Sequence, residues 1–203
     1  MALGFLALGD SYTIGEGVAP CERWPVQLAA RLRGEGVDIA DPRVVAKTGW
    51  TTDELAAAME TTTFTSAYAL VTLLIGVNNQ YRGRGVDQYR VQFRALLQRA
   101  IQLAGGHATH VIVISIPDWG VTPFAAREGH DVARVAREID AFNAIASAAT
   151  ASVGAAWVDV TTISRQPESR DELVGDGLHP SGAQYARWTD TILPAARTIL
   201  AGD

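Results

Sequence analysis

Two short segments, far apart in the sequence, contain residue types that together support nucleophilic catalysis. Ser11 ends the run Gly9-Asp10-Ser11, and His179 lies three residues after Asp176. Serine is a weak nucleophile until a base removes its proton, and histidine is the side chain suited to that task near neutral pH. An aspartate can accept a hydrogen bond from the other ring nitrogen and so hold the required tautomer. The two segments therefore predict Ser11 as nucleophile, His179 as general base and Asp176 as its orienting partner.

Each segment taken alone also has a purely structural interpretation. Gly-Asp-Ser commonly forms a turn, and an isolated Asp-x-x-His more often caps a turn and the helix that follows it. The two become informative together, because one acyl-transfer site requires a nucleophile, a base and an acidic partner for the base. Asp10 directly precedes Ser11 and is expected to brace its loop, since Asp176 is better placed to contact His179.

Two more segments contain groups that can donate hydrogen bonds to a developing oxyanion. Gly49 lies in residues 46–51 and Asn78 in residues 75–80, each just after an apolar run. The backbone N–H groups of Ser11 and Gly49 and the side-chain amide of Asn78 would supply such donors, and the loss of one donor costs about 3–4 kcal/mol. Taken singly, Gly49 could instead serve a tight turn and Asn78 could cap a helix.

The candidate residues follow short apolar runs that alternate with segments of helical periodicity. The predicted strands are residues 4–8, 43–46, 69–75, 110–116 and 155–158, and the predicted helices are residues 24–33, 52–59, 88–103, 132–153 and 181–200. This alternation predicts an α/β fold, a three-layer αβα sandwich with a central sheet of about five parallel strands. Ligands bind such sheets beyond the carboxyl ends of the strands. The irregular residues 117–129 and 161–175 are expected to form the rims of a cleft.

Length and composition restrict the class of protein. The 203 residues, 48% hydrophobic and 19% charged, suit one water-soluble domain that spans residues 1–203. A net charge of −5 with scattered Lys and Arg residues argues against nucleic acid as a partner. Cys21 is the only cysteine and no Cys/His cluster has zinc spacing, so neither an intrachain disulfide nor a metal site is expected. No apolar stretch reaches the ~20 residues of a membrane span and no signal peptide is recognisable, so we expect a cytoplasmic location.

The four segments, taken in order, resemble the four sequence blocks of the SGNH hydrolase superfamily, whose members include GDSL-like esterases and lipases, thioesterases and carbohydrate deacetylases. The matching residues are Gly-Asp-Ser at 9–11, glycine at 49, Gly-x-Asn at 76–78 and Asp-x-x-His at 176–179. The resemblance extends from about Leu6 to the last predicted helix. It implies a flavodoxin-like αβα fold, the same catalytic and oxyanion roles as above, and no metal or organic cofactor.

The resemblance implies a serine esterase that hydrolyses small carboxylic esters, short-chain acyl or acetyl-carbohydrate, through an acyl-enzyme on Ser11. A thioesterase or an acyltransferase would use the same residues, and a non-catalytic flavodoxin-like module that binds a small molecule is a further alternative; the oligomeric state stays open. Two positions depart from the family pattern: Asn79 replaces the usual Asp of the third block, and Tyr12 replaces the Leu of the GDSL name. Trp50, Asn79 and Tyr81 are the expected substrate contacts.

Overall fold

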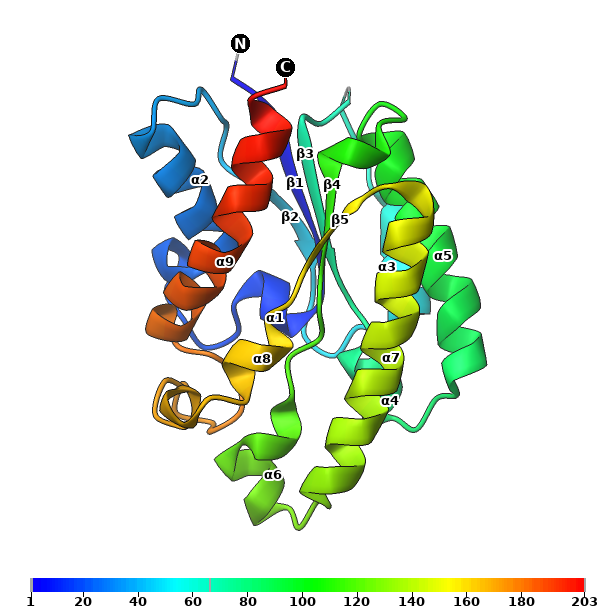
Figure 1. Ribbon diagram of the computed structural model, residues 1–203, viewed down its shortest axis with the longest axis vertical. Helices are drawn as coiled ribbons and strands as arrows, with labels where there is room; N and C mark the ends of the chain where they lie inside the picture. The colour runs from blue at the N-terminus through cyan, green and yellow to red at the C-terminus, as the bar shows by residue number, and fades with distance from the viewer. Residues whose placement is uncertain (1, 66, 203) are drawn as a thin grey trace.

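The computed structural model describes residues 2–65 and 67–202, which contain a five-stranded sheet (Figure 1). Its strands are β1 (Phe5–Gly9), β2 (Arg43–Ala46), β3 (Leu70–Leu74), β4 (Val111–Ile114) and β5 (Ala156–Val158). All neighbouring strands are parallel, in the order β2-β1-β3-β4-β5. Gly9 pairs with Ala46 of β2 and with Leu74 of β3, so these three strands end at the same level. The predicted α/β class and the sheet of about five parallel strands are confirmed.

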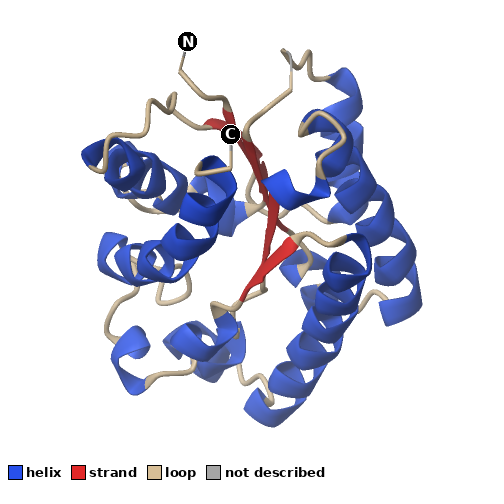
Figure 2. Ribbon diagram, turned by 45° about the horizontal axis from the view of Figure 1, so that its top comes forward, coloured by secondary structure: helices blue, strands red, loops and turns tan. Residues whose placement is uncertain are grey.

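The sheet is covered by helices on both faces. Strands β1, β3 and β4 are buried along their whole length, whereas the edge strands β2 and β5 are partly exposed. The covering helices are α2 (Trp24–Gly34) and α9 (Gly182–Leu200) on one face and α3 (Thr52–Thr61), α5 (Val86–Leu103) and α7 (Val132–Val153) on the other. Figure 2 shows the sheet edge-on between these two layers. Continuous apolar strands are stable in this arrangement because neither face meets water.

The long helices begin and end at residues that satisfy their free backbone groups. Helix α7 begins after Asp131, whose carboxylate accepts from the backbone N–H of Arg134 at 3.0 Å, and ends at Gly154, which has φ 75°. Helix α3 begins with a capping box between Thr51 and Glu54. Such caps supply partners for the N–H and C=O groups that a helix terminus leaves without intrahelical bonds. These local signals explain why the helix bounds were predictable to within a few residues.

Several single-turn helices were not predicted from the sequence. They are α1 (Ser11–Ile14), α4 (Val77–Tyr81), α6 (Pro123–Arg127) and α8 (Thr161–Ser164), together with the 3₁₀ turns η1 (Pro20–Glu22), η2 (Ala108–His110), η3 (Trp119–Val121) and η4 (Pro167–Arg170). Four or five residues are too few to display the 3.6-residue period on which helix prediction depends. Helices α6 and α8, with η3 and η4, lie in the two stretches that were expected to be irregular.

The chain direction places the candidate residues at one end of the sheet. From β1 the chain moves to β2 on one side and then to β3 on the other, so the strand order reverses between β1 and β3. In open parallel sheets a crevice forms at this reversal, beyond the carboxyl ends of the strands. Ser11 follows β1 and Asn78 follows β3, so they flank this crevice. Within residues 2–65 and 67–202, no helix combines the length and the apolar character that crossing a membrane requires.

Candidate active site

The turn after β1 is compact because Gly9 has no side chain. A Cβ on Gly9 would lie 2.5 Å from the carbonyl oxygen of Leu74, closer than any side chain tolerates. The chain then turns at Asp10, whose Oδ1 accepts from the backbone N–H of Tyr12 at 3.1 Å, and Ser11 becomes the first residue of α1. Asp10 therefore braces this loop as a hydrogen-bond acceptor, as expected from the sequence.

Asp10 is completely buried, and this changes its charge. Its Oδ2 atom has no hydrogen-bond partner among the described residues. Burial raises the pKa of Asp10 to about 7, and the hydrogen bond from Tyr12, which acts in the opposite direction, only partly offsets this effect. The carboxyl group next to Ser11 is thus held largely uncharged below about pH 7.

One carboxylate accepts several hydrogen bonds within the turn that contains His179. Asp176 accepts three hydrogen bonds, from the backbone N–H of Leu178 at 2.7 Å, from the backbone N–H of His179 at 3.0 Å and from His179 Nδ1 at 2.7 Å. Partial burial acts to raise the pKa of Asp176, but these hydrogen bonds outweigh it and hold the pKa below its usual value. An ionised Asp176 therefore fixes Nδ1 as the protonated ring nitrogen, which leaves Nε2 free to accept a proton.

One cavity brings the predicted residues together. Its volume is about 220 Å³, and Ser11, Gly49, Asn78 and His179 are among the residues that line it. These four residues come from three different strand ends and from the turn before α9, so only the tertiary fold makes them neighbours. In the part of the chain that the structure describes, no group of three or more His, Cys, Asp and Glu side chains could hold a metal ion.

The loops after β2 and β3 are joined by side chains that cross between them. Asn78 Nδ2 donates to the carbonyl oxygen of Trp50 at 2.9 Å, and Arg82 Nη2 donates to the carbonyl oxygen of Gly49 at 2.7 Å. Gly49 has φ 85°, a conformation that glycine adopts without strain. Its backbone N–H donates to no acceptor within residues 2–65 and 67–202, and one hydrogen of the Asn78 amide remains after the bond to Trp50.

The structure does not place Asn79 or Trp50 on the cavity. Asn79 is fully buried, its Oδ1 accepts from Thr52 N at 3.0 Å, and its Nδ2 donates to Thr52 Oγ1 at 2.7 Å. Asn79 therefore anchors the start of α3 and has no surface left for a substrate, contrary to the expectation. The Trp50 side chain packs against the core. Its connection to the cavity residues is through its carbonyl oxygen, which accepts the hydrogen bond from Asn78. Tyr81 does line the cavity and is 51% exposed.

The sequence analysis did not identify most of the residues that form the cavity wall. The additional lining residues are mainly apolar or aromatic and are Tyr12, Val77, Trp119, Phe124 and Leu178, with Thr48 as a polar member. Tyr12 packs against the His179 ring at 5.6 Å between centroids, so the residue that replaces Leu in the first block contacts the imidazole. A signal for Tyr12 and Leu178 was present, because each is adjacent to a candidate catalytic residue. Trp119 and Phe124 lie in residues 117–129, which were expected to form a rim of the cleft, but nothing in the sequence singled out these two side chains.

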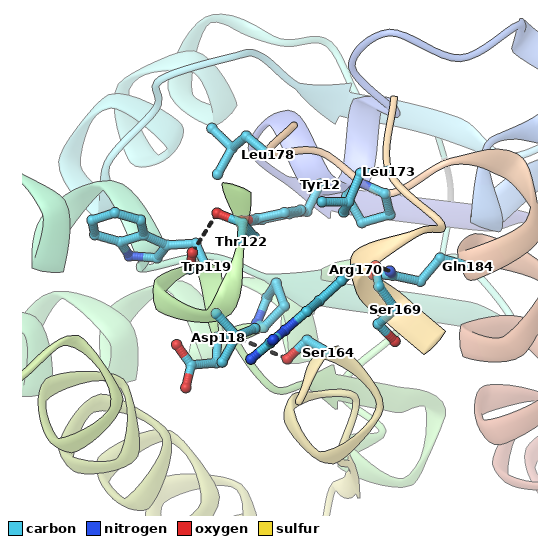
Figure 3. Close-up of a pocket in the computed structure, with 13 residues that line it drawn as sticks. Tyr12, Asp118, Trp119, Thr122, Ser164, Ser169, Arg170, Leu173, Leu178 and Gln184 are labelled. Carbon is cyan, nitrogen blue, oxygen red and sulfur yellow. Dashed lines mark hydrogen bonds between the residues drawn. The ribbon is translucent and has the colours of Figure 1, made fainter. Parts of the chain in front are cut away.

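A much smaller cavity lies next to this wall. Figure 3 shows Tyr12, Leu178, Thr122 and Trp119 on one side of it and Ser169 and Arg170 on the other. Its volume of about 10 Å³ is comparable to the space that one water molecule needs. It is therefore too small for a substrate, and the cavity at Ser11 is the candidate active site.

Comparison with known families identifies the family of this chain. The sequence model of the GDSL-like lipase/acylhydrolase family matches residues 7–187, which include all the candidate residues from Ser11 to His179. A search of curated proteins found no match.

Solved structures show the same fold at low sequence identity. TesA is 21% identical, with a TM-score of 0.72 over 97% of this chain and 99% of its own. The lipase/acylhydrolase from Enterococcus faecalis is 20% identical, with a TM-score of 0.75 over 100% of this chain and 97% of its own. A variant of the acetyl xylan esterase Axe2 from Geobacillus stearothermophilus is 18% identical, with a TM-score of 0.71 over 97% of each chain. At these identities the similarity establishes the fold.

Proposed function

Because the chain belongs to the GDSL-like lipase/acylhydrolase family, we propose that it is a serine esterase that hydrolyses small carboxylic esters through an acyl-enzyme on Ser11. The observation that carries the proposal is the shared cavity: Ser11, Gly49, Asn78 and His179 line it, and His179 Nδ1 is bonded to Asp176 at 2.7 Å. A nucleophile, an oriented base and two kinds of hydrogen-bond donor around one space are the parts that acyl transfer requires.

The first half of the reaction acylates the enzyme. Ser11 Oγ attacks the ester carbonyl carbon while His179 Nε2 takes the hydroxyl proton, and the carbonyl π electrons move to the oxygen. This oxyanion accepts hydrogen bonds from the N–H groups of Ser11 and Gly49 and from the Asn78 amide. The bond to the alcohol oxygen then breaks, and the protonated His179 gives its proton to the leaving alcohol. Asp176 remains ionised throughout and stabilises the charged imidazole.

The second half releases the acid. Water loses a proton to His179 Nε2 as its oxygen attacks the acyl carbon, and the same donors stabilise the second oxyanion. When this second tetrahedral intermediate collapses, the bond between the acyl carbon and Ser11 Oγ breaks. Ser11 Oγ regains its proton from His179, and the enzyme returns to its starting state.

The size and the lining of the cavity support small acyl groups. A volume of about 220 Å³ lies below the ~300–1,000 Å³ that pockets for drug-sized ligands occupy. Its walls are largely apolar, from Tyr12, Val77, Phe124 and Leu178, which suits the methyl or short alkyl chain of an acyl group. Acetyl to butyryl esters are therefore the proposed substrates.

A fluorophosphonate probe tests the nucleophile directly. The wild type and Ser11→Ala are incubated with the probe, digested and mapped by mass spectrometry, and both are assayed with 4-nitrophenyl esters from acetate to octanoate. We expect the label on Ser11 alone, a decline in kcat/KM beyond butyrate, and a loss of about 10⁴-fold or more in Ser11→Ala. A folded Ser11→Ala protein with wild-type rates would disprove the proposal.

A further inference from the structure

A larger cavity lies directly beside the candidate active site. It has a volume of about 420 Å³ and lies between the segment that follows α4 and the first turns of α7. Tyr81 and Trp119 line both this cavity and the one that contains Ser11, so the two spaces share a wall. A substrate bound at Ser11 that extends past Tyr81 and Trp119 would enter this second cavity.

The shared wall is fixed in position by buried hydrogen bonds. Trp119 Nε1 donates to Gln80 Oε1 at 2.7 Å, and Gln80 Nε2 donates to Glu138 Oε2 at 2.7 Å. The Tyr81 ring packs edge-on against Trp119 at 5.3 Å, and the His130 ring packs against Trp119 at 4.8 Å. Figure 3 shows the Trp119 indole extending away from Ser169 and Arg170. The wall is therefore a defined surface against which a ligand can pack.

The second cavity is positively charged in a chain that is negatively charged overall. Arg84, Arg134 and Arg137 line it together with a single glutamate, Glu138, whereas the whole chain has a net charge of −5. Arg134 forms an ion pair with Glu138 at 3.3 Å, and Arg84 forms one with Asp53. Arg137 has no ion-pair partner among residues 2–65 and 67–202. The cavity thus contains uncompensated positive charge.

One of these arginines occupies a position that the helix dipole does not favour. Arg134 lies in the first turn of α7, which begins after Asp131, and that turn contains no acidic residue. The N-terminus of a helix carries a partial positive charge that disfavours cations in the first turn. An arginine at this position breaks a local rule, and such exceptions are expected where residues serve a binding site.

The rest of the lining is apolar. Val86, Val135, Ala141 and Phe142 contribute to the cavity beside the aromatic wall. Val86 and Tyr81 are also among the few large hydrophobic side chains that are exposed, at 37% and 51%. Exposed apolar surface next to arginines suits a ligand that combines an apolar or aromatic stem with an anionic end.

We propose that this second cavity binds a carboxylate or phosphate group carried on the ester substrate at a distance from the scissile bond. The inference rests on the proposed esterase function, because it identifies the preferred esters as anionic ones. Arg134 and Arg137 contact the anion, and Tyr81 and Trp119 pack against the stem that joins it to the ester. The anion belongs either to the alcohol half or to the acyl half, and substrate pairs distinguish the two.

The test compares esters that differ only in charge. On the alcohol side the pair is 4-acetoxybenzoate and 4-acetoxybenzamide; on the acyl side it is mono-4-nitrophenyl glutarate and the corresponding 4-nitrophenyl glutaramate. In one pair we expect the wild type to prefer the anionic ester by about 10-fold in kcat/KM, and the preference to weaken as salt is raised. The double variant Arg134→Gln/Arg137→Gln should reduce this ratio to within about twofold while neutral esters keep their wild-type rates.

A matched variant controls for the loss of a surface arginine. Arg99 lies in the last turns of α5 and is exposed, and among the described residues its side chain bonds only to Gln102. Arg99→Gln should leave the ratio unchanged, and thermal unfolding should verify that all variants are folded. The proposal is overturned if the wild type shows no preference in either pair, or if the preference survives in the Arg134→Gln/Arg137→Gln protein.

A binding measurement separates this inference from the proposed function. Calorimetric titration of Ser11→Ala with both members of each pair measures affinity without turnover. Suppose that an anionic ester binds more tightly than its neutral partner but is not hydrolysed by the wild type. The anion-site proposal would then stand, and the esterase proposal would be wrong. If all four esters are hydrolysed with equal rates and bind with equal affinities, the esterase proposal would stand and the anion-site proposal would be wrong.

Discussion

Two turns contain the proposed nucleophile and the proposed base, and the aspartates in them have opposite electrostatic behaviour. Asp10, beside Ser11, is fully buried, accepts one hydrogen bond from a backbone N–H and has its pKa raised by burial to about 7. Asp176, in the turn of His179, has a partly exposed carboxylate that accepts three hydrogen bonds and holds a pKa below the usual value.

The difference follows from burial and hydrogen-bond donors acting together. Burial acts to raise the pKa of both groups, but Asp10 is fully buried with one donor, whereas Asp176 is partly exposed and has three donors, which outweigh the effect of burial. An ionised Asp176 can stabilise a charged His179, whereas Asp10 shapes the backbone and, below about pH 7, places little negative charge next to Ser11. One turn is thus suited to proton transfer and the other to holding Ser11 in place.

The largest expected effect follows from removing the charge of Asp176. Asp176→Asn keeps the size of the side chain but cannot stabilise the imidazolium, so kcat should fall by about 10³- to 10⁴-fold with little change in KM. Steady-state kinetics with 4-nitrophenyl acetate measures this. Asp171→Asn, at an exposed aspartate nearby, is the control and should keep the wild-type kcat. Loss of less than about 10-fold in Asp176→Asn would mean that His179 works without an ionised partner.

The next effect concerns stability and depends on pH. In the unfolded chain Asp10 loses its proton near pH 3.8, but in the folded chain only near pH 7, so between these values the folded state binds more protons. Stability therefore falls as pH rises through this window, by up to about 4 kcal/mol from this group. Urea unfolding of the wild type and Asp10→Asn at pH 4 and pH 8 should show that the wild type loses this amount relative to the variant. Parallel pH profiles would contradict the assignment.

A smaller effect is expected at the oxyanion donors. Asn78→Ala removes the side-chain amide and its bond to Trp50, and kcat should fall by about 10²-fold, roughly 3 kcal/mol. Arg82→Gln is the control because it removes another bond between the same loops, to the carbonyl of Gly49, without removing an oxyanion donor. It should cost less than about 1 kcal/mol in kcat/KM. Equal losses in both variants would indicate that Asn78 acts only by bracing the loop.

The sequence alone determined the elements and the local chemistry of the site. The strand and helix bounds could be predicted because apolar periodicity and capping residues act over a few neighbouring positions. The contact between Asp176 and His179 could be predicted for the same reason, because its partners lie three residues apart and one turn joins them. Gly9 and Ser11 lie at the end of the first strand, where the chain must turn.

The tertiary structure decided which residues line the cavity. Asn79 directly follows Asn78, yet Asn78 reaches the cavity while Asn79 is buried against Thr52, because successive residues of α4 point in different directions. The burial that neutralises Asp10 arises from helices and strands packed around it. Trp119 lines both the cavity at Ser11 and the larger cavity beside it, although its loop lies more than 100 residues after Ser11 in the sequence. These outcomes depend on the packing of distant segments, and no spacing within the sequence encodes them.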